Sequence, residues 1–72
     1  MNKYGYEVII WWSKEDDFYL AEVPELPGCI ADGDTFMEAT KAVEESMRLW
    51  IDFNTERGMI IPEPKGRRLS YA

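Results

Sequence analysis

The chain contains no histidine and a single cysteine, Cys29, among its 72 residues. An intrachain disulfide is therefore impossible, and a zinc site built from Cys and His has too few ligands. Without histidine, Ser–His and Cys–His nucleophile pairs are excluded as well. Domains this small often depend on a disulfide or a metal for stability. This one must depend on packing and, we expect, on association into a homodimer or higher oligomer.

Long hydrophobic runs are also missing. The longest uninterrupted apolar run covers residues 8–12, far short of the roughly 20 residues that span a bilayer as a helix. The first seven residues lack the apolar stretch of a signal peptide, and an unpaired cysteine suits a reducing compartment. We therefore expect one cytoplasmic domain over residues 1–72, with no membrane partner.

Basic side chains are scarce, with 8 Lys and Arg against 14 Asp and Glu and a net charge of −6. A short basic cluster, Lys65, Arg67 and Arg68, lies near the end of the chain. Because an acidic body repels phosphate backbones, we expect no direct nucleic-acid binding. The charge suits a basic protein partner, although keeping a small protein soluble accounts for it equally well.

Aromatic and β-branched residues predict three extended segments, at residues 4–12, 18–23 and 29–32. Polar residues 13–17 form a turn between the first two segments. Pro24, Pro27 and Gly28 interrupt the pattern, and we expect them to shape the bend before the third segment. Gly33 is expected to turn the chain into a helix. Residues 69–71 are a candidate final edge strand.

The helix has the clearest signals in the chain. Thr35 and Glu38 form a T-x-x-E capping box, and Gly58 suits a left-handed C-cap. Between them, apolar residues recur at spacings of three and four, which predicts one buried stripe. That stripe comprises Phe36, Ala39, Val43, Ser46, Trp50 and Phe53, widened by Ala42, Met47 and Leu49. The pattern predicts an α+β fold, a small antiparallel sheet of three to four strands with one helix packed on one face.

Both faces of the predicted hairpin are apolar, because side chains in a strand alternate between faces. One helix covers only one face, and a contiguous exposed apolar patch usually marks an interaction site. The hairpin register, and with it the face that meets the helix, stays open at this stage. Our candidates for the partner or oligomer interface are Ile9, Trp11, Phe18 and Leu20. The alternative is that the chain's own residues 60–71 cover this face.

Residues 19–29 read YLAEVPELPGC, residues 31–35 read ADGDT, and residues 61–64 read IPEP. In combination with Glu38 and Ala39, these motifs resemble the N-terminal domain of HicB-family antitoxins over roughly residues 4–64. The resemblance implies a partial RNase H-like fold without catalytic activity or cofactor. It also implies a HicA-like toxin as partner, a small basic protein that cleaves mRNA and whose active site the antitoxin covers. Many members continue into a C-terminal DNA-binding domain, which we do not expect here.

Two other functions compete with an antitoxin. A homo-oligomeric structural or regulatory domain without a toxin would use the same exposed face for self-pairing. A metal-dependent nuclease would need converging carboxylates, yet most of the acids lie in predicted turns, as Asp16, Asp17 and Asp34 do. Solvated surface charge accounts for them better, and we expect no catalytic and no metal-binding residues.

Overall fold

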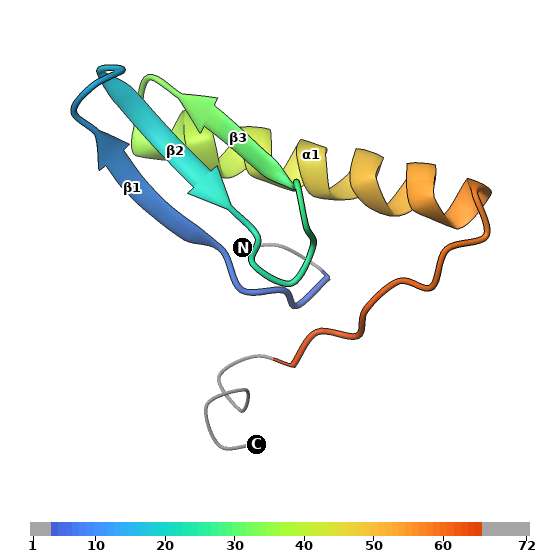
Figure 1. The fold of residues 1–72 in the computed structure, drawn as a ribbon. Coiled ribbons are helices and arrows are strands. Elements are labelled where there is room, and N and C mark those ends of the chain that lie inside the picture. Colours follow the sequence, from blue (N-terminus) through green and yellow to red (C-terminus); the bar gives the residue numbers. More distant parts are fainter. Residues whose placement is uncertain (1–3, 66–72) are drawn as a thin grey trace.

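The computed structural model describes residues 4–65, and within that range the chain forms one sheet with one helix behind it (Figure 1). The strands and the helix are β1 (Ile9–Ser13), β2 (Phe18–Glu22), β3 (Ile30–Gly33) and α1 (Phe36–Glu56). The described sheet has three strands in the order β1-β2-β3, and both neighbouring pairs are antiparallel. The predicted α+β class and the single helix on one face are confirmed.

The strands are shorter than the extended segments predicted from composition. β1 begins at Ile9, opposite Glu22, where β2 ends. Within the described range 4–65, no residue of β2 therefore pairs with residues 4–8, and Gly5 turns the chain there with a φ of 84°. The prediction of one continuous strand over residues 4–12 was wrong, because composition does not show where the partner strand ends.

The turn between β1 and β2 fixes the register of the hairpin. The Asp17 amide donates to the Ser13 carbonyl at 2.9 Å, and Asp17 adopts a left-handed φ of 58°. Within the turn, the Ser13 hydroxyl donates a second hydrogen bond to the Asp16 carboxylate at 2.9 Å. As a result Ser13 lies opposite Phe18, and every pairing further along β1 follows from this one.

The bend between β2 and β3 is held by its own backbone. The Val23 amide donates to the Cys29 carbonyl at 3.0 Å, and the Cys29 amide donates to the Leu26 carbonyl at 2.9 Å. Gly28 supplies a left-handed φ of 85°, which glycine adopts without steric cost. The bend thereby turns the Leu26 side chain into the core, where it is fully buried.

Both ends of α1 carry the signals that the sequence predicts. Thr35 and Glu38 form a reciprocal capping box, with the Glu38 amide 3.1 Å from the Thr35 hydroxyl. At the other end Gly58 has a φ of 77°, and its amide donates to the Thr55 carbonyl at 3.0 Å. The Met59 amide donates to the Asn54 carbonyl at 2.9 Å, which completes a Schellman motif.

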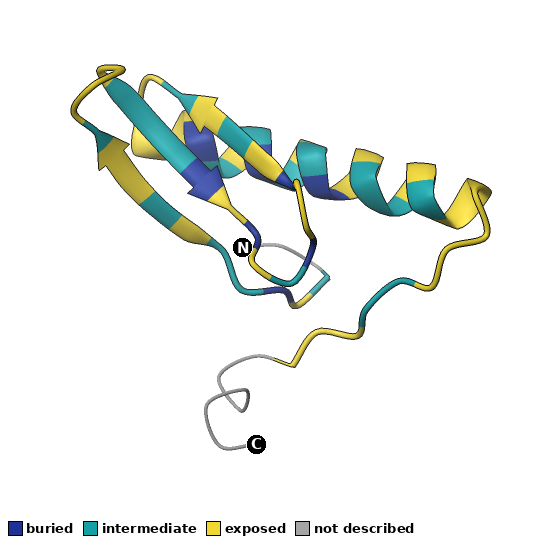
Figure 2. Cartoon of the chain, viewed as in Figure 1, coloured by how far each residue is buried: buried dark blue, intermediate teal, exposed yellow. Residues whose placement is uncertain are grey.

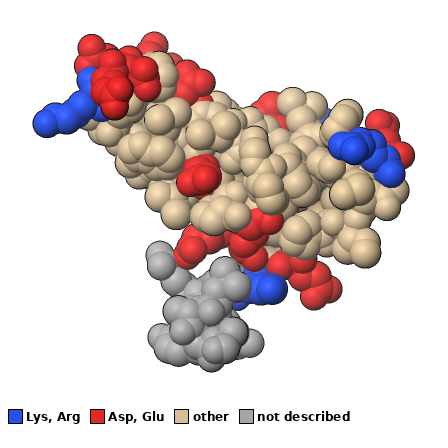
Figure 3. Space-filling view, viewed as in Figure 1, with Lys and Arg blue, Asp and Glu red and all other residues tan. Residues whose placement is uncertain are grey.

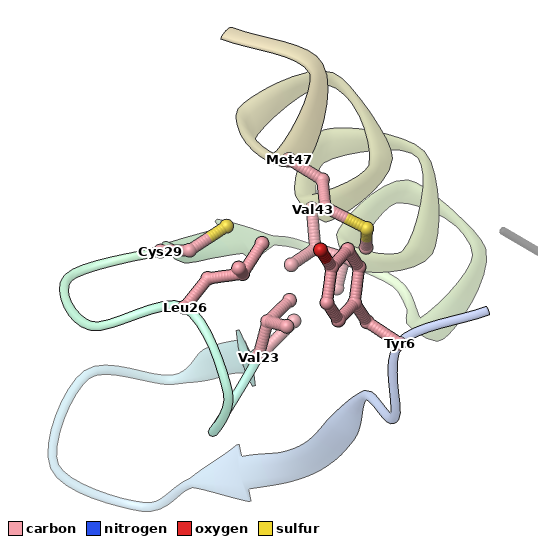
Figure 4. Packing of buried hydrophobic residues seen from close by; sticks show 8 residues of the cluster. Tyr6, Val23, Leu26, Cys29, Val43 and Met47 are labelled. Atoms are coloured by element: carbon pink, nitrogen blue, oxygen red, sulfur yellow. The ribbon is translucent and has the colours of Figure 1, made fainter. Parts of the chain in front are cut away.

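The core lies between the sheet, the β2–β3 bend and one face of α1 (Figure 4). The figure shows side chains from the N-terminal segment, the bend and the helix converging on one another. The buried cluster consists of Tyr6, Ala21, Val23, Leu26, Cys29, Ala39, Val43 and Met47. Gly33 lets the end of β3 approach the helix closely, since a Cβ at that position would lie 2.4 Å from the Ala39 amide nitrogen.

Two aromatic residues expected on the buried stripe, Phe36 and Phe53, are exposed instead. The buried stripe runs through Ala39, Val43 and Met47. Three strands cover only about 10 Å of width, so a helix can bury no more than a narrow sector against them. Phe53 lies outside that sector, on a flank of the helix, and the prediction that it belongs to the core was wrong.

The chain after the helix returns to the body as an extended segment, which we call the arm (residues 59–65). The Tyr6 hydroxyl donates to the Pro62 carbonyl, and the Lys65 amide donates to the Glu25 carboxylate at 3.0 Å. The arm is thus held at the N-terminal segment and the β2–β3 bend. The described part of the tail leaves Ile9 and Trp11 exposed, so it does not cover that face of the sheet. The candidate strand at residues 69–71 lies outside the described residues.

We expect Tyr6→Phe to loosen the arm, because it removes the donor to the Pro62 carbonyl. The free energy of unfolding should fall by about 0.5–1.5 kcal/mol, and exchange of the Lys65 amide hydrogen should become faster. Burial, and then the charges of Glu25 and Glu63, raise the pKa of the Tyr6 hydroxyl. Its stabilising effect should therefore be complete below about pH 10 and decline as the pH rises toward the folded pKa. Unchanged amide exchange in the variant would contradict this role.

We expect Gly33→Ala to destabilise the protein severely, by about 3 kcal/mol or more, because the new methyl group would collide with the helix backbone. Gly28→Ala is the matched control, since a Cβ there meets no atom within 4 Å and adds only the strain of a positive φ. That strain costs about 1–2 kcal/mol. Urea unfolding of both variants measures the difference, and equal losses would refute the close approach.

Candidate functional site

The hairpin register brings the four candidate interface residues onto one face of the sheet. Trp11 lies opposite Leu20, and Ser13 lies opposite Phe18. Their neighbours in sequence, such as Ile10 and Ala21, pack toward α1. Since side chains alternate along a strand, the candidates point away from the helix. We call this surface the outer face; its apolar members are Ile9, Trp11, Phe18, Leu20 and Ile30.

Ile30 is the member of the outer face that sequence reasoning missed. It lies on β3 beside Glu22, which in turn lies opposite Ile9 on β1. The signal was the alternation within β3, where the small Ala31 packs inward between outward-pointing Ile30 and Asp32. A four-residue strand is too short for that alternation to stand out in the sequence.

The outer face is open to solvent at both of its edge strands (Figure 2). Relative exposure is 47% for Ile9, 39% for Trp11 and 51% for Ile30, while Phe18 and Leu20 on the central strand are half-buried. Exposed Ile and Trp side chains on strands are unusual for a sheet face that meets only water.

Acidic side chains lie between and around the apolar ones. Glu22 separates Ile9 from Ile30 across the sheet, and Asp32 lies beside Leu20; both acids are exposed. In Figure 3, which views the molecule from the sheet side, acidic groups gather over the hairpin turn and along the opposite end, around a largely uncharged middle. The outer face therefore combines apolar side chains with acidic ones that lie both among them and around them.

The two adjacent tryptophans of β1 have different environments. The Trp12 ring packs edge-to-face on Tyr19 at a centroid distance of 5.0 Å, and Tyr19 packs in the same way on Phe36 at 6.0 Å. Trp12 thus belongs to the side of the sheet that meets the helix, although it is partly exposed. Trp11 points to the outer face, which resolves the choice that the sequence left open.

Reactive groups are few on the described part of the chain. Cys29 is buried, and burial raises the pKa of its thiol, which disfavours the nucleophilic thiolate. Among residues 4–65, no three Asp, Glu or Cys side chains gather closely enough to hold a metal ion. Within the same range, α1 is not apolar enough to cross a membrane.

Comparison with known proteins identifies the family of this chain. A family model described as the HicB-like antitoxin of bacterial toxin–antitoxin systems matches residues 6–69. The chain belongs to the HicB-like antitoxin family. It is also 34% identical over 65 residues to the UPF0150 protein Ta0767 of Thermoplasma acidophilum. The aligned region covers 90% of this chain and 93% of that protein. No solved structure matches it significantly.

The motif that carries the HicB likeness lies mostly away from the outer face. The glycines and prolines of this motif occupy the β2–β3 bend and the β3–α1 junction, and the capping pair begins the helix. These structural candidates are Pro24, Pro27, Gly28, Gly33, Thr35 and Glu38. Pro27 also contacts the helix, since its carbonyl accepts a hydrogen bond from the Trp50 indole at 2.8 Å. The structure thus separates the candidate residues into two sets. The motif residues shape the backbone, and the interface candidates form the outer face.

Proposed function

We propose that this HicB-like protein is a non-catalytic antitoxin that binds a small, HicA-like, mRNA-cleaving toxin through the outer face and covers the toxin's active site. The observation that carries the proposal is the contiguous apolar patch around Trp11, which neither the helix nor the arm covers. Patches of this kind mark partner surfaces in soluble proteins. Family membership supports a toxin as the partner.

The patch has the composition of a binding centre. Trp11 lies beside Leu20 in the middle of the hairpin, with Ile9 and Ile30 at its margins. Tryptophan is enriched among residues that dominate binding energy, and full burial of a large apolar side chain contributes roughly 1.5–3 kcal/mol. A toxin that closes over this patch would bury these side chains together and exclude water from them.

The acids give the patch a preference for a basic partner. Glu22 and Asp32 lie within the patch, and the whole chain carries a net charge of −6. A nuclease that binds RNA phosphates presents cationic side chains at its active site, and these side chains would pair with the two carboxylates. Complementary charge of this kind raises the association rate and selects the partner. The proposed activity needs only this domain, acting in the cytoplasm where mRNA is cleaved.

Co-expression with the product of an adjacent small basic reading frame tests the proposal. We expect the two proteins to co-purify and the antitoxin to restore growth. Trp11→Ala should weaken the complex by at least about 2 kcal/mol, or roughly 30-fold in Kd. Met37→Ala is the control, since Met37 is exposed on α1, away from the patch. Normal complex formation by Trp11→Ala, with circular dichroism showing a folded chain, would exclude the outer face as the toxin site.

We also expect Glu22→Lys combined with Asp32→Lys to slow association at low salt and to reduce its dependence on ionic strength. Opposite charges steer encounter, and salt screens them with a Debye length of about 10 Å at 0.1 M. Stopped-flow mixing with the basic partner measures both effects. An association rate that stays the same at low salt would show that these carboxylates do not face the partner.

The alternative function, a homo-oligomeric domain without a toxin, rests on the same apolar face. It predicts that the chain alone forms an oligomer that Trp11→Ala disrupts, and that no adjacent basic protein binds. The co-expression experiment and sedimentation of the isolated chain therefore separate the two functions.

A further inference from the structure

We draw no further inference here: the strongest candidate, the exposed apolar flank of α1 that carries Leu49 and Phe53, has nothing in the described part of the structure to show what covers it.

Discussion

The packing of a single helix against a sheet of three described strands governs the rest of this structure. Gly33 permits the close approach of β3 to the helix, and Ala21, Val43 and Met47 fill the interface without any exposed surface. The helix covers one face and a narrow sector of its own circumference. Apolar side chains remain exposed as a direct consequence, both on the outer face of the sheet and on the flank of α1 that carries Leu49 and Phe53. Our proposal places a toxin on the outer face.

The residues that define the family and the residues that would choose a partner are largely separate. The HicB-like motif builds the β2–β3 bend and the entry to α1, where the Leu26 side chain and the Gly33 backbone have little freedom to change. The side chains of the outer face do not restrict the backbone in this way. Neither Trp11 nor Ile30 packs against the buried cluster, so other side chains at these two positions would leave the core undisturbed.

The sequence predicted the structural features that depend on residues close together in the chain. The capping box of Thr35 and Glu38 and the C-cap at Gly58 are properties of a few consecutive residues, and both are present. The rotation of the helix about its axis depends on where the sheet ends, so Phe53 could not be assigned to the flank from spacing alone. The hydrogen bond between Tyr6 and Pro62 joins residues 56 positions apart and has no local signal.

The sequence predicted four residues of the outer face but not how the sheet arranges them. The alternation in β1 separated Trp11 from Trp12, yet only the left-handed turn at Asp17 sets the register that directs Trp11 outward. Ile30 joined the site because β3 pairs with β2, a long-range fact that a four-residue strand does not reveal.

The most direct measurement is a titration of the chain, labelled with nitrogen-15, with the proposed HicA-like toxin, following the indole N–H resonances of the three tryptophans of the chain. Trp11 lies on the outer face. The Trp50 indole, on α1 at the opposite side of the sheet, donates a hydrogen bond to the Pro27 carbonyl. We predict that the Trp11 resonance shifts or broadens on binding while the Trp50 resonance stays in place. A complex that forms while the Trp11 resonance remains unchanged would contradict the assignment of the outer face to the toxin.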